Sequence, residues 1–257
     1  MGGGPIVVVG AGLAGLRTVE RLRRLGHAGP ITLVGAEPGP AYDRPPLSKS
    51  LLIAEDEPAG PVLLRPADAY AELDVDVRWG VTAVGVDTAA RRVVLDDGTV
   101  GYDRLVIATG ARARRVAAWD RFANVHTLRT WADCQALRAA LASARHVTVV
   151  GAGVLGSEIA AATRTRGIAV TLVEEQAHPL VRLVGRHLAT VVADLHRAHG
   201  VDLRLGVRVE ALEAGEDGRV RGARLSDGTA VATDVVVVAI GSVAATDWLA
   251  GSDIAVA

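Results

Sequence analysis

Short apolar runs alternate with longer stretches of helical periodicity at the start of the chain. Residues 6–9 are continuously apolar, which is typical of a parallel strand buried on both faces. Residues 13–25 repeat apolar side chains at helical spacing, and Gly26 ends that pattern. Residues 31–34 form a second apolar run. The order strand, helix, strand predicts a βαβ unit and therefore an α/β fold.

Glycines stand where the first strand would turn into the helix. They have the spacing G-x-G-x-x-G, in the sequence Gly-Ala-Gly-Leu-Ala-Gly. The first glycine of such a loop permits a tight turn, the second lets a pyrophosphate approach the backbone, and the third lets helix and strand pack closely. N–H groups at the start of the helix then face the phosphates. The predicted phosphate-binding residues are Gly10, Gly12, Leu13, Ala14 and Gly15.

An acidic residue completes this first pattern. Glu37 follows the second strand, roughly twenty residues after the glycines, where a carboxylate accepts hydrogen bonds from an adenosine ribose. A solvated surface carboxylate is the alternative interpretation, and the position of Glu37 favours the ribose.

The whole pattern returns in the second half of the chain. Residues 146–150 predict a strand, a second G-x-G-x-x-G follows, a helix runs to about Arg166, and residues 169–173 predict another strand. Glu174 and Glu175 follow that strand at the same spacing. The predicted nucleotide-binding residues here are Gly151, Gly153, Val154, Leu155, Gly156 and Glu174.

A series of short strands returns as well. Residues 75–79, 82–86 and 92–95 read as strands, and Asp97-Gly98 is a hairpin turn that Asp227-Gly228 repeats. Residues 103–110 match residues 234–241. The chain is therefore predicted to contain an internal duplication of a nucleotide-binding fold with a β-meander, giving two Rossmann-like domains. The alternative is that the glycine turns only aid packing.

Other segments have less regular patterns. Residues 38–49 are proline-rich and present Arg44 and Lys49, which suits an anionic or flavin ligand or an ordinary surface loop. Residues 111–124 are predicted to be an irregular, arginine-rich linker; these arginines would be solvated or would form a docking patch for an acidic protein. Residues 131–141 predict a helix that Thr130 caps. Residues 182–199 predict an amphipathic helix with apolar positions at Leu188, Val191, Val192 and Leu195.

Composition excludes several classes of function. The 257 residues are 50% apolar with a net charge of −1, so nothing favours a nucleic-acid partner or a membrane surface. No apolar run is long enough for a membrane span and no leader peptide is recognisable, which favours a cytoplasmic protein. The single cysteine, Cys134, excludes a disulfide framework and a C-x-x-C redox pair. No metal site is predicted, because His196 and His199 suit a helix C-terminus better than a metal pair.

Two dinucleotide sites in one chain suggest two cofactors that react with each other. The economical chemistry is hydride transfer from a nicotinamide to a flavin, which the cofactors themselves perform. Two adjacent acids, Glu174 and Glu175, would repel a 2′-phosphate, so NAD is favoured over NADP.

The sequence resembles the FAD-dependent pyridine nucleotide reductases, specifically the ferredoxin reductase branch that serves cytochrome P450 and ring-hydroxylating dioxygenase systems. The resemblance covers essentially the whole chain, and Arg-Pro-Pro-Leu-Ser-Lys at residues 44–49 is its most specific motif. The disulfide-reducing relatives place redox cysteines near that motif, and this chain has none. The other motifs that carry the resemblance are the two glycine loops, Tyr102-Asp103-Arg104, Ala108-Thr109-Gly110, Leu128-Arg129-Thr130 and Gly156-Ser157-Glu158.

The resemblance implies a role for each of these residues. The first glycine loop and Glu37 would hold the adenosine and pyrophosphate of FAD. Lys49 would lie beside the flavin, paired with Glu158, as the two residues closest to the chemistry. The second glycine loop and Glu174 would hold NAD(H), with Gly241 near the nicotinamide. Further FAD contacts would come from Arg44, Ala83, Ala108, Thr109, Gly110 and Arg129.

The resemblance also implies a domain arrangement. Residues 1–115 and 242–257 would form the FAD-binding domain, with an NAD-binding domain at residues 116–241 inserted into it. The chain ends earlier than the family pattern, so it is expected to be a fragment or a natural short form. It also carries Ala36 where relatives often have another acid.

The expected function is an NADH-dependent reductase that passes electrons through FAD to a ferredoxin-type [2Fe-2S] protein. One alternative is a shortened homologue that binds nucleotide without turnover and acts as a binding or regulatory module. A second alternative is a nitrite- or rubredoxin-linked reductase of the same superfamily.

Overall fold

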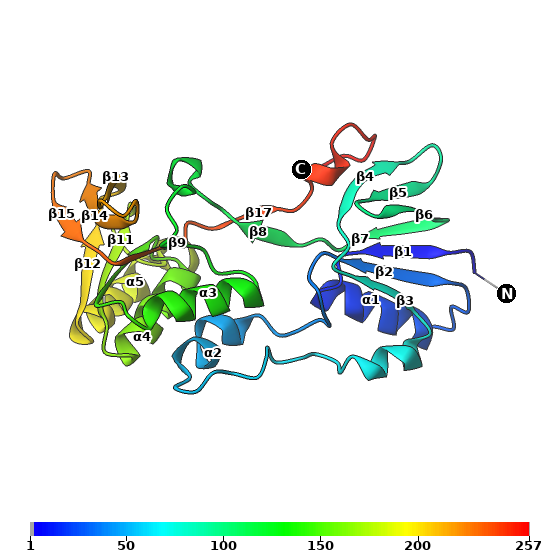
Figure 1. Cartoon of the computed structure of the whole chain (residues 1–257), viewed down its shortest axis with the longest axis horizontal. Helices are drawn as coiled ribbons and strands as arrows, with labels where there is room; N and C mark the ends of the chain where they lie inside the picture. The colour runs from blue at the N-terminus through cyan, green and yellow to red at the C-terminus, as the bar shows by residue number, and fades with distance from the viewer. Residues whose placement is uncertain (1–2, 257) are drawn as a thin grey trace. The chain divides into compact units, whose positions relative to one another are not determined.

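The computed structural model describes residues 3–256 and divides into two compact units. Among these residues, the first unit comprises residues 3–43, 62–112 and 244–256. The second comprises residues 44–61 and 113–243. Each unit is described by itself (Figure 1).

The first unit is built on a parallel sheet with the strand order β3-β2-β1-β7. The central strand β1 pairs in parallel with β2 and β7, and β2 pairs with β3. A second, antiparallel sheet has the order β4-β5-β6. The elements are β1 (Ile6–Val9), α1 (Leu13–Arg24), β2 (Ile31–Gly35), η2 (Asp68–Leu73), β3 (Asp76–Trp79), β4 (Ala83–Asp87), β5 (Arg92–Leu95), β6 (Gly98–Gly101), β7 (Arg104–Ile107) and η4 (Asp247–Leu249).

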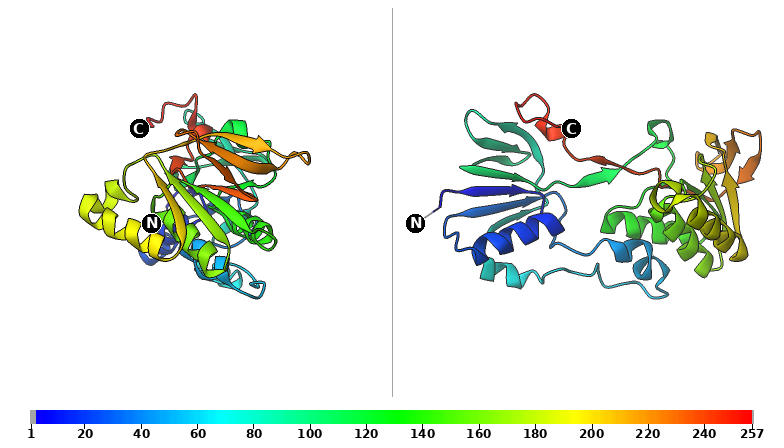
Figure 2. Two further views of the ribbon diagram at one scale, coloured as in Figure 1. Left: turned by 90° about the vertical axis from the view of Figure 1, so that its left-hand side faces the viewer. Right: turned by 180° about the vertical axis from the view of Figure 1, so that it is seen from behind.

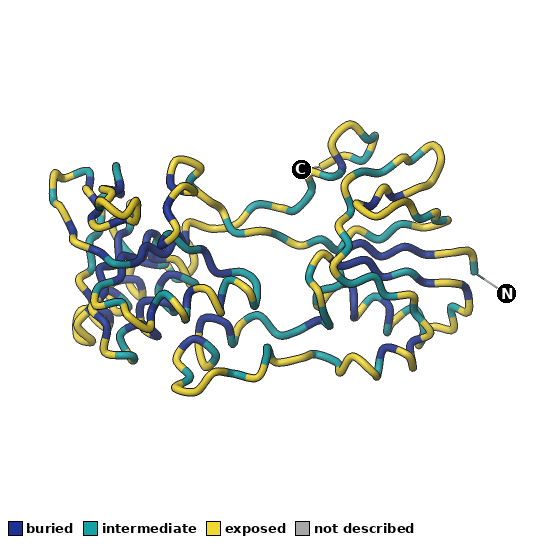
Figure 3. Tube along the Cα trace, viewed as in Figure 1, coloured by how far each residue is buried: buried dark blue, intermediate teal, exposed yellow. Residues whose placement is uncertain are grey.

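The central strands β1 and β2 of this parallel sheet are almost entirely buried, as expected for apolar strands that are covered on both faces. One face packs against α1, where Val8 and Leu33 meet Leu16. On the other face Val7 packs with Val93 of the antiparallel sheet. Helix α1 and the antiparallel sheet lie on opposite sides of the parallel sheet (Figure 2). The central strands are coloured dark blue, as buried, in Figure 3.

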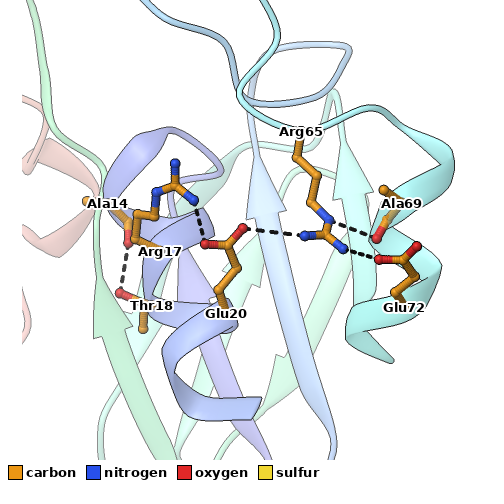
Figure 4. Close-up of polar contacts among 7 residues, drawn as sticks. All are labelled: Ala14, Arg17, Thr18, Glu20, Arg65, Ala69 and Glu72. Atoms are coloured by element: carbon orange, nitrogen blue, oxygen red, sulfur yellow. Dashed lines mark hydrogen bonds and ion pairs between the residues drawn. The ribbon is translucent and has the colours of Figure 1, made fainter. Parts of the chain in front are cut away.

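A chain of charged side chains ties η2 to α1 (Figure 4). Glu20 of α1 lies 2.6 Å from Arg17 and 3.6 Å from Arg65. Arg65 also contacts Glu72 at 2.6 Å and donates to the carbonyl of Ala69 at 2.8 Å. Residues 65–72 are thereby fixed to the helix that follows the first glycine loop.

The second unit repeats this plan with one more strand. Its sheet has the order β12-β11-β10-β16-β9, and β10 pairs in parallel with β11 and β16, as β1 does with β2 and β7. A three-stranded antiparallel sheet, β13-β14-β15, again accompanies it. The elements are η1 (Pro45–Ser48), α2 (Ser50–Ile53), η3 (Ala117–Trp119), β9 (Val125–His126), α3 (Trp131–Leu141), β10 (His146–Val150), α4 (Val154–Thr165), β11 (Ala169–Glu174), α5 (Val181–Ala198), β12 (Val201–Leu205), β13 (Val209–Ala214), β14 (Val220–Leu225), β15 (Ala230–Ala232) and β16 (Val235–Val238). The predicted α/β fold with a duplicated unit is confirmed.

The structure adds elements that the sequence pattern missed. Residues 111–124, expected to be irregular, contain β8 (Ala111–Ala113) and η3. β8 pairs with β17 (Ser242–Ala244) in a two-stranded sheet. Trp119 and Phe122 are buried with Val209 and Leu225, so part of this segment belongs to the core of the second unit.

Helix α3 begins where the sequence predicted. The Thr130 hydroxyl accepts a hydrogen bond from the Asp133 amide at 3.1 Å, and the Asp133 carboxylate accepts from the Thr130 amide at 2.9 Å. This reciprocal capping box satisfies N–H groups that the first turn leaves unpaired.

Helix α5 faces the sheet with a different side from the one that its apolar pattern suggests. Ala189 and Ala193 are buried, whereas Leu188, Val191 and Leu195 are each more than half exposed. Small residues allow the helix to pack closely against the sheet, and the larger apolar residues lie outside that contact. No helix among the described residues has the length and apolarity that a membrane span requires.

Residues 44–61 differ from the expected domain boundaries. The prediction grouped them with the first unit, whereas in the structure they cluster with the second. Arg138 of α3 donates to the carbonyl of Leu51 at 2.6 Å, and Arg166 donates to that of Leu52 at 3.2 Å. These contacts join residues far apart in sequence, so local patterns could not reveal them.

Candidate functional site

The first glycine loop has the geometry that its spacing predicts. Gly10 has a φ of +112°, and a Cβ there would lie 2.1 Å from the carbonyl oxygen of Ala108. A Cβ on Gly15 would lie 1.9 Å from the carbonyl oxygen of Gly10. A Cβ on Gly12 would meet nothing within 4 Å. The outer glycines are therefore required by the fold, and Gly12 keeps a space beside the backbone open.

The second loop repeats this division of roles. Gly151 has a φ of +98°, and its Cβ would lie 2.6 Å from the carbonyl oxygen of Ala239. A Cβ on Gly156 would lie 1.8 Å from the carbonyl oxygen of Gly151, whereas Gly153 has open space. The loops also share their anchors, because the Gly10 amide donates to Val34 and the Gly151 amide to Val173.

Both loops lead into a helix whose first turn offers free donors. The N-cap residues of α1 and α4 are Gly12 and Gly153, and neither makes a side-chain cap. The first N–H groups of an α-helix have no partner within it, and the helix dipole makes this end attractive to anions. Leu13 and Val154, which follow the caps, are 54% and 50% exposed, so both helices begin at the surface. Both glycine loops, with the helix N-termini that follow them, fit a pyrophosphate.

The two acidic residues have different partners. Glu37 accepts a hydrogen bond from the hydroxyl of Tyr42. Glu174 accepts from the backbone amides of Ala152 at 2.7 Å and Gln176 at 2.9 Å, one on each carboxylate oxygen. The second carboxylate is thus bound to the glycine loop itself.

A cavity of about 540 Å³ opens over the second glycine loop. Such a volume is within the range of sites for small molecules. Gly153, Glu174 and Gly241, which the sequence analysis assigned to a nicotinamide nucleotide, are among the residues that line it. Arg182 and Arg208 line it too, and sequence reasoning missed both, because neither stands in the glycine motif.

An ion pair joins the proline-rich segment to α4. Lys49 Nζ lies 2.8 Å from Glu158 Oε1, which brings together the two residues that the resemblance paired. Sequence reasoning did not assign a role to Ser48, whose hydroxyl donates to Glu158 Oε2 at 2.6 Å. Its place in the Arg-Pro-Pro-Leu-Ser-Lys motif was the available signal. Lys49 is about half exposed and Glu158 is 27% exposed, so the pair is accessible from solvent.

The remaining predicted FAD contacts fall into two groups. The first unit holds Ala83, Ala108, Thr109 and Gly110. Arg44 and Arg129 belong to the second unit, where the guanidinium of Arg44 donates to the Arg129 carbonyl. The predicted FAD contacts thus come from both units.

The single cysteine is part of the interior of the second unit. Cys134 is fully buried, and burial raises the pKa of its thiol. Its Sγ lies 3.4 Å from the carbonyl oxygen of Leu47, to which the protonated thiol donates. The described residues contain no group of three or more His, Cys, Asp or Glu side chains that could hold a metal ion.

Comparison with known proteins places this geometry in a family. The sequence profile of the pyridine nucleotide-disulphide oxidoreductase family matches residues 4–257. The chain belongs to this family. The predicted resemblance is thereby confirmed, and it extends to the ferredoxin reductases within the pyridine nucleotide-disulphide oxidoreductases.

Two curated relatives show how far the likeness extends. Rhodocoxin reductase of Rhodococcus erythropolis is 39% identical over 240 residues, which cover 93% of this chain and 56% of the relative. The ferredoxin--NAD(+) reductase component of the p-cumate 2,3-dioxygenase system of Pseudomonas putida is 42% identical over 238 residues, which cover 92% and 58%. The chain thus spans somewhat more than half the length of these relatives.

A solved structure matches the fold over the whole chain. The covalent complex of putidaredoxin reductase with putidaredoxin has a TM-score of 0.94 at 32% sequence identity. The match covers 100% of this chain and 63% of that one.

Proposed function

We propose that this chain is the nucleotide-binding part of an NADH-dependent flavoprotein reductase whose electrons go to a ferredoxin-type [2Fe-2S] protein. The observation that carries the proposal is the glycine loop that occurs twice with the same backbone geometry. Two loops of this kind suit two dinucleotides, here FAD and NAD(H). When bound, the nicotinamide supplies a hydride and the flavin accepts it.

The first unit is the proposed FAD-binding domain. Gly12 leaves room for the pyrophosphate, and the amides that begin α1 donate to it. Glu37, held by Tyr42, accepts hydrogen bonds from the adenosine ribose. Ala108, Thr109 and Gly110 follow β7, the neighbour of the loop strand β1, and provide further backbone contacts for the cofactor.

The second unit is the proposed NAD-binding domain, with its ligand in the cavity over Gly153. Glu174 and Glu175 line this cavity, and their charge disfavours a 2′-phosphate. Arg182 and Arg208 line it as well, which opposes that preference. NAD remains the proposed nucleotide because Glu174 is fixed at the loop itself by two backbone amides.

Lys49 and Glu158 are the proposed residues of the reactive end. Lys49 would supply a positive charge beside a bound flavin, where a fixed cation stabilises negative charge. Glu158 is the ion-pair partner of this ammonium group. Neither residue acts as a nucleophile. The proposal also includes a cytoplasmic location, where the free thiol of Cys134 stays reduced.

The relatives support the choice of electron acceptor. Their names include rhodocoxin reductase and ferredoxin--NAD(+) reductase components of dioxygenase systems. The structure with the TM-score of 0.94 is a complex with putidaredoxin.

The test is a visible absorption spectrum of the purified protein, with FAD added where needed, before and after anaerobic addition of NADH. We expect flavin bands that NADH bleaches. NADH binding by calorimetry without any flavin binding would contradict the reductase and would indicate a module that only binds nucleotide. Bleaching by NADPH at lower concentration than by NADH would contradict the proposed nucleotide preference.

A further inference from the structure

Two neighbouring residues contact the two oxygens of one carboxylate. Lys49 Nζ lies 2.8 Å from Glu158 Oε1, and Ser48 Oγ lies 2.6 Å from Glu158 Oε2. A hydroxyl has one hydrogen to donate. The short bond to the charged carboxylate therefore takes precedence over the Pro45 carbonyl, which is 3.4 Å from the same oxygen. Glu158 is held at both oxygens by one short segment.

The contacts from Ser48 and Lys49 differ in how firmly they can hold the Glu158 carboxylate. Ser48 is 3% exposed, whereas the side chain of Lys49 is 51% exposed. An exposed ion pair fixes geometry weakly, because water competes for both charges and the long side chains keep their freedom. The terminal torsion of a glutamate is itself soft. The buried hydroxyl, rather than the exposed ammonium group, therefore sets the orientation of the carboxylate.

Ser48 is in turn held by a rigid surrounding. Leu47, the preceding residue, is 2% exposed, and its carbonyl accepts the thiol hydrogen of Cys134. Arg138 donates to the Leu51 carbonyl of α2 at 2.6 Å. Helix α2 lies close to α3 and α4 within the second unit (Figure 1). The hydroxyl thus projects from a segment that is anchored on both sides of it.

We propose that Ser48 is a positioning residue for the ammonium group of Lys49 and acts through Glu158. This role rests on the function proposed above, in which Lys49 supplies a fixed positive charge. A cation stabilises developing charge best when it is held in place before the reaction. Without the hydroxyl, the carboxylate of Glu158 can turn, which weakens its contact with Lys49 and leaves the ammonium group with the longer, 3.4 Å contact to the Pro45 carbonyl.

The test uses the fact that Lys49 is the only lysine in the sequence. The rate of its acetylation by acetic anhydride, measured by mass spectrometry on the peptide that carries it, reports how well the ammonium group is held. The protein is used as purified, and no cofactor is needed. We expect Ser48→Ala to raise this rate on the order of threefold, because a hydrogen bond to a charged group is lost.

Three further variants bracket this result. Ser48→Thr keeps the hydroxyl and should restore a rate close to that of the unchanged protein. Glu158→Gln removes the charge and should raise the rate at least as much as Ser48→Ala. Ser50→Ala is the matched control, because Ser50 is exposed two residues away and should leave the rate unchanged.

Two outcomes would overturn the proposal. One is a Ser48→Ala rate equal to that of the unchanged protein while Glu158→Gln reacts faster. The other is an increase in Ser50→Ala as large as that in Ser48→Ala, which would indicate general loosening. Should Ser48→Ala fail to fold by circular dichroism, Ser48→Cys takes its place, because it retains the volume and weakens the donor.

A second measurement separates this inference from the proposed function. If the protein binds FAD and oxidises NADH, Ser48→Ala should lower kcat for reduction of a dye by about tenfold and leave KM unchanged, which is the loss expected of an interaction made in the transition state. A protein that binds no flavin contradicts the proposed function, and the acetylation rates still decide the role of Ser48.

Discussion

In the first unit the acid after the second strand, Glu37, accepts a hydrogen bond from the side chain of Tyr42. In the second unit the corresponding acid, Glu174, accepts from the backbone amides of Ala152 and Gln176. The carbonyl of Ala152 also accepts from the Leu180 amide at 3.0 Å. Ala152, the second residue of the second glycine loop, is therefore hydrogen-bonded through both its amide and its carbonyl group.

This difference shows that equivalent positions of a repeated motif can have different structural roles. The Glu37 carboxylate accepts from a side chain, so changing it leaves the backbone of the first glycine loop directly unaffected by the loss of this bond. Glu174 organises the glycine loop and the connection to α5, so changing it disturbs the site even without nucleotide. The two glycine loops share their backbone geometry, and the surrounding side chains set how firmly each loop is held.

The largest effects should come from the third glycine of each loop. In Gly15→Ala and Gly156→Ala the new Cβ would lie 1.9 Å and 1.8 Å from a carbonyl oxygen of the same loop. Each change should lower the free energy of unfolding by about 3 kcal/mol or more, because the backbone must move. Urea denaturation measures this, with Gly101→Ala as control, since its Cβ meets nothing closer than 3.9 Å. If only one of the two substitutions destabilised the protein, the two glycine loops would not be structurally equivalent.

The middle glycines should separate the two ligands. In Gly12→Ala and Gly153→Ala the new methyl group enters open space, so the fold should keep its stability. The same methyl group obstructs a pyrophosphate. Gly12→Ala should weaken FAD binding on the order of 100-fold, about 2.7 kcal/mol, and Gly153→Ala should weaken NADH binding similarly. Calorimetry with both nucleotides measures this. Loss of one and the same nucleotide in both variants would refute the assignment of the units.

The two carboxylates should respond unequally to neutralisation. Glu174→Gln places an amide NH₂ group against the backbone N–H of Ala152 or Gln176, so about 1–2 kcal/mol of unfolding free energy should be lost. NADH affinity should fall about tenfold, which corresponds to about 1.4 kcal/mol. Glu37→Gln can still accept from Tyr42, so its effect on unfolding should be under about 1 kcal/mol. Equal losses in urea denaturation would contradict the difference between the sites.

The smallest expected effect is that of mildly acidic pH, which should lower the stability of the second unit before that of the first. Burial lowers the pKa of His126 and of His196, both in the second unit. Below about pH 6.5 the unfolded chain binds protons that the folded chain does not, so stability falls as pH drops from there towards the folded pKa values. The slope is at most about 1.4 kcal/mol per pH unit for each histidine.

Hydrogen exchange at pH 7.5 and pH 5.5 locates this effect. Peptides of the second unit should lose protection at the lower pH, and His196→Gln should reduce the loss. Earlier loss in peptides of the first unit would contradict the expectation.

The parts of the fold that local pattern determines were predictable. The βαβ units follow from apolar runs and glycine spacing, and Thr130 was recognisable as the cap of α3 because capping depends on adjacent residues. The buried face of α5 was not predictable. It is formed by the small residues Ala189 and Ala193, which a search for large apolar side chains does not reveal. The anchoring of residues 44–61 was also missed, since it depends on partners such as Arg138 and Glu158, far away in the sequence.

For the candidate site, too, residues in local motifs were predictable and residues outside them were not. The glycine loops and the acids after them were visible as spacing, and the Lys49–Glu158 pair came from family resemblance. Arg182 and Arg208 enter the cavity from α5 and from the residues before β13, where nothing in their neighbourhood marks them. Ser48 was overlooked because an isolated serine in a loop has many ordinary explanations.

The chain leaves and re-enters each unit, and this has a consequence for how the protein is made. Trp248 and Leu249 pack on the first unit, yet the ribosome delivers them only after residues 113–243. At ordinary translation rates that interval lasts on the order of ten seconds. During this interval the apolar cluster of the first unit lacks Trp248, so a nascent chain stalled there would offer an apolar surface to chaperones.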